Sequence, residues 1–198
     1  MRLENQQPKS IPLLTQDQRL KWIKELLTGD GESLHYRVAG ILVLLYAQPL
    51  VKVAVLPTTA IVAASGDTRI SLGAEPVPVP EPFGSMLEHH LHHRPNLGTA
   101  SRMAANPWLF PSRHPGKHRH TRSIVNRLSA VGINVLGARD SALRNLVAEM
   151  PPPVVAQLLG FSDSATTILP GDGKATGMQA NSHCDATQAG RRLIDPHN

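Results

Sequence analysis

The chain has 198 residues, of which 41% are hydrophobic, so its composition excludes wholesale disorder and leaves room for one folded domain. Aromatic residues make up only 4%, which predicts an aliphatic core. The net charge is +5, and the single cysteine, Cys184, excludes an internal disulfide and a thiolate metal site. That cysteine usage favours a reducing, cytoplasmic location.

The first third of the chain predicts two helices after a flexible N-terminus, residues 1–12, that carries no secretion signal. Thr15 and Gln18 form a capping box, and apolar residues at helical spacing follow as far as Leu27. Glycines at 29 and 31 end that helix, and Ser33 can cap a second one that runs to Ala47.

Residues 38–55 are apolar enough to raise the question of a membrane span. Gln48, Pro49 and Lys52 interrupt the segment, and the uninterrupted part is shorter than the ~20 residues that a spanning helix needs. We therefore expect a buried helix, followed by a short helical turn at 51–55, and no membrane contact.

The middle of the chain predicts a small antiparallel sheet. Residues 61–64 and 69–72 flank a turn at 65–67, which is a hairpin signal. Residues 77–80 favour a third strand, confined to the sheet edge because its prolines lack a ladder donor. A helix over 81–93 should follow.

The second half predicts three more helices after a loop at 95–106, a short buried segment at 108–110 and a basic loop at 111–120. Thr121 can cap the first of these helices, which Gly132 ends. The others cover residues 138–149 and 154–159, with a break at Pro151–Pro153 and a stop at Gly160. The expected fold class is mainly α with a small antiparallel β-sheet (α+β).

Positive charge is concentrated between residues 94 and 144, where nine basic residues stand against one acid, Asp140. One basic face on an otherwise slightly acidic chain is typical of a protein that binds phosphates. The alternative is an ordinary solvated surface.

Four histidines, at positions 89, 90, 92 and 93, could place two imidazoles on one helix face and so suit a metal ion. Because no complete ligand set accompanies them, a solvated helix face is the preferred interpretation, with no metal and no cofactor. The sequence also lacks a phosphate loop after a strand and a nucleophile elbow.

Several short motifs together resemble the tyrosine recombinases, the phage-integrase family, over residues 13–167, and most closely a divergent, actinobacterial-like group. Residues 44–50 (LLYAQPL) are similar to its first box, 108–112 (WLFPS) to its "lFps" segment, and 139–160 to its second box and following helices. The resemblance implies a catalytic-domain fold. Residues 168–198 are expected to form a poorly structured tail, because glycine and polar residues dominate there and apolar periodicity disappears.

The resemblance also implies a chemistry in which a tyrosine attacks a DNA phosphodiester while two arginines and a histidine stabilise the phosphate. Of these, only Arg139 matches. Val51, followed by Lys52, stands at the first arginine, and the hairpin lysine is absent from 74–76. Leu136, Phe161 and Pro170 stand where the family has two histidines and the tyrosine. The only tyrosines, Tyr36 and Tyr46, are expected in the core.

These departures predict a recombinase-like domain that binds DNA through its phosphate backbone and is catalytically inactive. Its expected DNA-binding residues are basic, namely Lys52, Arg113, Lys117, Arg119, Arg122 and Arg127, beside Arg139 in the former active site. The partners expected are DNA and a second protomer or partner recombinase.

Two alternatives stay open. The chain could be a protein-interaction remnant of an integrase with no DNA role, or, less favoured, a metal-binding protein built on the histidine cluster. The departure from the family pattern after residue 167 further suggests a truncation or a change of reading frame, and the family's N-terminal clamping domain is expected to be absent.

Overall fold

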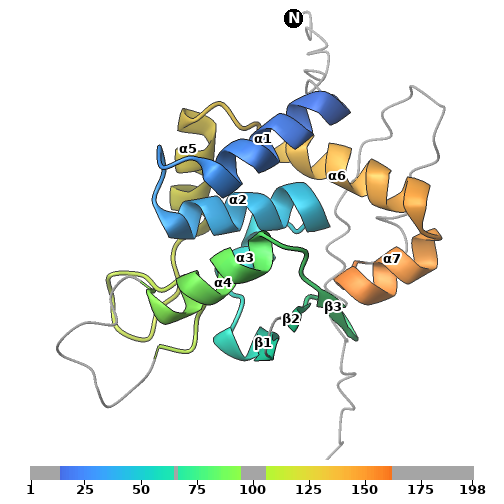
Figure 1. The fold of residues 1–198 in the computed structure, drawn as a ribbon. Coiled ribbons are helices and arrows are strands. Elements are labelled where there is room, and N and C mark those ends of the chain that lie inside the picture. The colour runs from blue at the N-terminus through green and yellow to red at the C-terminus, as the bar shows by residue number, and fades with distance from the viewer. Residues whose placement is uncertain (1–13, 65–66, 95–105, 162–198) are drawn as a thin grey trace, which may run out of the picture. The chain divides into compact units, whose positions relative to one another are not determined.

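The computed structural model describes residues 14–64, 67–94 and 106–161. Within these ranges the protein is mainly helical with one small antiparallel sheet, which confirms the expected class (Figure 1). The predicted flexible N-terminus, the turn residues 65 and 66, most of the 95–106 loop and the tail at 168–198 lie outside the described residues.

In chain order the elements are α1 (Gln16–Thr28), α2 (Leu34–Tyr46), α3 (Leu50–Ala54), the 3-10 helix η1 (Thr58–Ala60), β1 (Ile61–Ala64), β2 (Asp67–Ser71), β3 (Pro76–Pro78), α4 (Phe83–His92), α5 (Thr121–Ala130), α6 (Val135–Glu149) and α7 (Pro152–Leu159).

Helix caps were predicted with mixed success. The capping box of α1 is present, with the Thr15 hydroxyl and the Gln18 side chain each accepting the other residue's backbone N–H. For α5 the prediction was wrong by one residue, because the imidazole Nδ1 of His120, not Thr121, accepts the backbone N–H of Arg122 at 3.1 Å. Ser33 stands at the N-cap of α2 without a side-chain cap bond.

The sheet has the order β1-β2-β3, with β3 paired only to β2 among the described residues. Ile61 lies opposite Ile70, and Ile70 lies opposite Val77, so one buried apolar row crosses all three strands. β3 covers Pro76–Pro78 and not residues 77–80, so its prolines are 76 and 78 rather than 78 and 80. The strand lies at the sheet edge, as expected from the donors that its prolines lack. β2 begins at Asp67, earlier than predicted, because residues 67 and 68 continue the hairpin ladder.

Two helices begin earlier than the sequence indicated. The Asn134 side chain accepts the backbone N–H of Gly137 at 3.2 Å, and this cap starts α6 at Val135. Helix α7 includes Pro152 and Pro153, where the chain was expected to be broken. The first turn of a helix does not use its N–H groups internally, so prolines fit there.

Helix α2 forms the centre of the core. Residues 38–44 are all buried, and α2 contacts α1, α4, α5 and α6 around its circumference (Figure 1). A helix that is apolar on every face needs such neighbours on every side. In the described part of the chain, no helix combines the length and the apolar character needed to cross a bilayer.

Candidate nucleic-acid interface

The turn between α2 and α3 is fixed by its backbone and by one buried amide. Ala47 adopts a left-handed conformation with φ 52°, which ends α2. The Gln48 side chain is buried, and its Nε2 donates to the Leu159 carbonyl of α7 at 3.0 Å. Pro49 then starts α3, so Val51 and Lys52 lie at the exposed beginning of this helix.

The end of α7 is held against the turn that follows β2. The backbone N–H of Ala74 donates to the Gln157 carbonyl at 3.0 Å. Gly73 is required there, because a Cβ atom on it would lie 2.3 Å from the same carbonyl oxygen. Gly160 ends α7 with φ 65°, a conformation that glycine adopts at little cost. The next residue, Phe161, is thereby brought beside α3 and α6.

Lys52, Arg139 and Phe161 meet in what we call the Phe161 cluster. The ammonium of Lys52 lies 6.0 Å from the centre of the Phe161 ring, and the guanidinium of Arg139 lies 5.8 Å from it. The three residues come from α3, α6 and the end of α7, and positive groups near an aromatic ring are attracted to its electron-rich face.

Each cation of the Phe161 cluster also binds a carbonyl at the end of a helix. Lys52 donates to the carbonyl of Gly160, and Arg139 Nε donates to the carbonyl of Ala47 at 3.0 Å. Helix C-termini carry partial negative charge, so these bonds help to fix both side chains. An ammonium has three donors and a guanidinium five, which leaves N–H groups of both for a phosphate.

The neighbouring positions supply no such donors. Val51 is 63% exposed and Leu136 is 56% exposed, although the resemblance places an arginine and a histidine of the family at these two positions. Apolar side chains cannot stabilise charge on a phosphate oxygen. The cluster thus consists of two cations around a phenyl ring.

Both tyrosines point into packed surroundings. Tyr46 is buried and its hydroxyl donates to the Pro78 carbonyl at 3.1 Å, and burial raises its pKa above the ordinary value. The Tyr36 hydroxyl accepts from Arg119 at 3.2 Å. The position aligned with the family's tyrosine, Pro170, lies outside the described residues.

The basic loop, residues 111–120, is shaped mainly by its main chain. Ser112 N–H donates to the Lys117 carbonyl at 2.9 Å, and Trp108 Nε1 donates to the Gly116 carbonyl at 3.1 Å. The side chains of Arg113, Lys117 and the nearby Arg122 are exposed. Although backbone groups of Lys117 and Arg122 form hydrogen bonds, the charged side-chain groups of these three residues form no hydrogen bond or ion pair with another residue in the described ranges.

Arg119 and Arg127 differ from those three because both lie against the ring of Tyr36. Their guanidinium carbons are 5.4 and 5.6 Å from the ring centre. Arg119 is half-buried, and Arg127 forms an ion pair of 3.0 Å with Glu32. The predicted DNA-binding residues therefore fall into three groups, namely the Phe161 cluster, the exposed cations around the basic loop and the pair on Tyr36.

The histidines of α4 and the His93 that follows it do not form one group. His89 and His93 stack with ring centres 4.2 Å apart, on one helix face as the spacing predicts. His90 instead is fully buried, stacks on Phe110 and bonds the Leu109 carbonyl at 3.0 Å. Burial is the main cause that lowers its pKa to about 4. Among the described residues, no three His, Cys, Asp or Glu side chains are placed to hold a metal ion.

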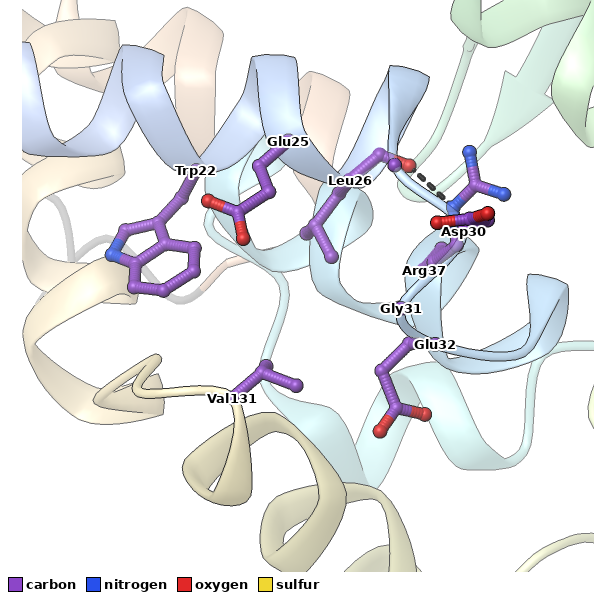
Figure 2. Close-up of a pocket in the computed structure, with 9 residues that line it drawn as sticks. Trp22, Glu25, Leu26, Asp30, Gly31, Glu32, Arg37 and Val131 are labelled. Atoms are coloured by element: carbon purple, nitrogen blue, oxygen red, sulfur yellow. Dashed lines mark hydrogen bonds between the residues drawn. The ribbon is translucent and has the colours of Figure 1, made fainter.

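A cavity of about 290 Å³ opens at the end of α1, where α5 ends and the chain turns into α2 (Figure 2). Trp22 and Glu25 lie side by side on one wall, and Glu32 and Val131 lie across from them. Sequence reasoning gave no signal for this cavity or for Glu32. It did mark Phe161, but as a missing histidine and not as the ring on which two cations meet.

Comparison with known proteins supports the fold. No family model matches the sequence, and no curated protein matches it significantly. Among solved structures, the chain is similar to the integrase of transposon Tn1549 (residues 82–397), determined in complex with circular-intermediate DNA. The TM-score is 0.53 at 13% identity, over 82% of this chain and 63% of that one. The fold is thus similar to that of an integrase, and the chain spans less than two thirds of the solved integrase chain.

Proposed function

We propose that this chain is a DNA-binding domain of the tyrosine-recombinase type that lacks strand-cleavage chemistry, with residues 13–167 as its integrase-like unit. The observation that carries the proposal is the Phe161 cluster. Lys52, Arg139 and Phe161 converge from distant parts of the sequence, where the family's phosphate-binding residues are expected by resemblance. The cluster supplies positive charge for a phosphate but no imidazole.

The missing groups determine what the site can do. Without a tyrosine hydroxyl at the phosphate, no covalent phosphotyrosyl intermediate forms. Loss of a single donor to a developing oxyanion costs about 3 kcal/mol, and here an arginine and two histidines are replaced by Val51, Leu136 and Phe161. Binding of the DNA backbone needs only the positive charges, which remain.

The first test joins a suicide-substrate cleavage assay to a salt titration of duplex-DNA binding on the same sample. We expect no covalent adduct. Three to five phosphate contacts should lower the affinity by roughly 40- to 500-fold between 50 and 200 mM salt, because counterions are released on binding. A covalent adduct would refute the loss of chemistry, and equal affinity at both salt concentrations would refute phosphate binding.

Removing the two positive charges of the Phe161 cluster should reduce the salt dependence of DNA binding. The double variant Lys52→Gln, Arg139→Gln should flatten the slope of log affinity against log salt by about 2, one unit for each lost phosphate contact. Lys21→Gln, which removes an exposed charge from α1, serves as the control. A thermal melt is needed beside it, because both cluster residues also bond helix-ending carbonyls. A folded double variant with an unchanged slope would show that the cluster does not contact DNA.

A second candidate is a protein-interaction domain without a DNA role. The observation in its favour is a set of exposed apolar side chains, namely Val51 on α3, Val55 directly after it and Leu136 on α6. Light scattering with and without DNA separates the two, since only an interaction domain would self-associate at high salt while ignoring DNA.

A further inference from the structure

The ion pair between Arg127 and Glu32 joins two segments that are 95 residues apart in the sequence. Arg127 Nη2 lies 3.0 Å from one carboxylate oxygen of Glu32 and 3.1 Å from the other. The two side chains differ in exposure, because 53% of the Arg127 side chain is accessible and only 7% of Glu32. The positive group therefore faces solvent while its negative partner lies behind it.

Arg127 is fixed in this place by a second contact. Its guanidinium lies over the Tyr36 ring, which also carries Arg119. A DNA phosphate would approach the exposed side of Arg127, where free N–H groups of the guanidinium remain. As long as Glu32 stays paired, however, its carboxylate occupies donors of Arg127 and cancels the positive charge that a phosphate would meet.

The cavity beside Glu32 leaves space for its carboxylate to move away from Arg127. Glu32 lines this space of about 290 Å³ together with Glu25 and Asp30, and Figure 2 shows its carboxylate at the wall opposite Trp22. Two further carboxylates line the cavity, as does the guanidinium of Arg37, which donates to the carbonyls of Leu26 and Leu27. Arg127 is the cation at ion-pair distance from Glu32, 3.0 Å away, so without DNA this pairing is favoured. When a phosphate competes for Arg127, the open cavity lets Glu32 turn away without disturbing the core.

We propose that Glu32 is an internal competitor of the DNA phosphate for Arg127, so that the DNA-free chain holds one of its DNA-binding cations masked. This inference rests on the proposed DNA-binding function. In this inference Glu32, in the turn between α1 and α2, regulates the contact between DNA and Arg127 on α5. Any change that removes the negative charge of Glu32 should strengthen DNA binding.

The test is a double-mutant cycle with Glu32→Gln, Arg127→Gln and the double variant, measured by duplex-DNA titration between 50 and 200 mM salt. Glu32→Gln keeps the size of the side chain and is expected to tighten binding about 3- to 10-fold, with a salt slope steeper by about 1. Arg127→Gln should weaken binding more in the Glu32→Gln background than in the wild type, and in that background it should abolish the gain. Asp17→Asn adds the same net charge from an exposed position on α1 and should leave binding within 2-fold.

The outcomes separate this inference from the function on which it rests. If the wild type binds DNA and Glu32→Gln binds no tighter than Asp17→Asn, the inference is wrong and DNA binding stands. Equal losses from Arg127→Gln in both backgrounds would likewise overturn it, because Arg127 would then contact DNA despite Glu32. If neither the wild type nor Glu32→Gln binds DNA, both the proposed function and the inference fail. Thermal melts of all variants establish that each is folded.

Discussion

Replacing Arg113, Lys117 and Arg122 together by glutamine is expected to weaken DNA binding on the order of 10²-fold at 100 mM salt. Each phosphate contact contributes a salt slope of about 0.9, so the slope should fall by nearly three. The charged side-chain groups of these residues have no hydrogen-bond or ion-pair partner among the described residues, so the loss of affinity should come without loss of stability. Fluorescence anisotropy of labelled duplex DNA over a salt series measures both quantities.

A charge-matched control distinguishes a specific surface from general attraction to a basic protein. Lys21, Lys24 and Arg144 are exposed on α1 and α6, and their triple change to glutamine removes the same net charge. We expect a much smaller loss of affinity from this control. An equal loss would mean that net charge alone drives binding and that the basic loop has no special part in it.

Acidification from pH 7.5 to pH 4.5 is expected to destabilise the fold through buried histidines. Burial is the main cause that lowers the pKa of His90 to about 4, whereas an unfolded histidine titrates near 6.5. Between these two pH values the unfolded chain therefore binds more protons than the folded one. The contribution of neutral His90 to the free energy of unfolding is fully present above about pH 6.5 and falls as the pH drops towards 4. For His90 alone the loss is on the order of 2 to 3 kcal/mol.

His35 should act in the same direction. Its pKa is also lowered to about 4, first by burial and then by the positive charges of Arg119, His90 and Arg127, in that order. Urea denaturation at pH 7.5 and pH 4.5 measures the combined effect. His90→Gln should reduce the difference in unfolding free energy between the two pH values, and His92→Gln, at an exposed position on the same helix, should leave it unchanged. Equal pH dependence in the wild type and His90→Gln would contradict the assignment.

Several features of the fold follow from local sequence alone, because their causes lie within a few residues of one another. The capping box at Thr15 and Gln18 starts α1, and apolar residues on every face predict that α2 is buried. Prolines in β3 predict an edge strand, since the missing donor acts at the residue itself. The boundaries of α6 and α7 were less accurate, because the Asn134 cap and the tolerance for prolines in a first turn depend on the exact start of the helix.

The sequence by itself therefore determined the helices, the small sheet and the concentration of basic residues between 94 and 144. Only the tertiary structure decided which of those charges act together. Lys52 reaches the end of α7 across 108 positions, and Arg139 reaches the end of α2 across 92, so no local pattern could have revealed the Phe161 cluster. Composition likewise cannot separate the exposed Lys117 from Arg127, whose charge is paired, because pairing depends on which distant carboxylate the packing of the helices brings within reach.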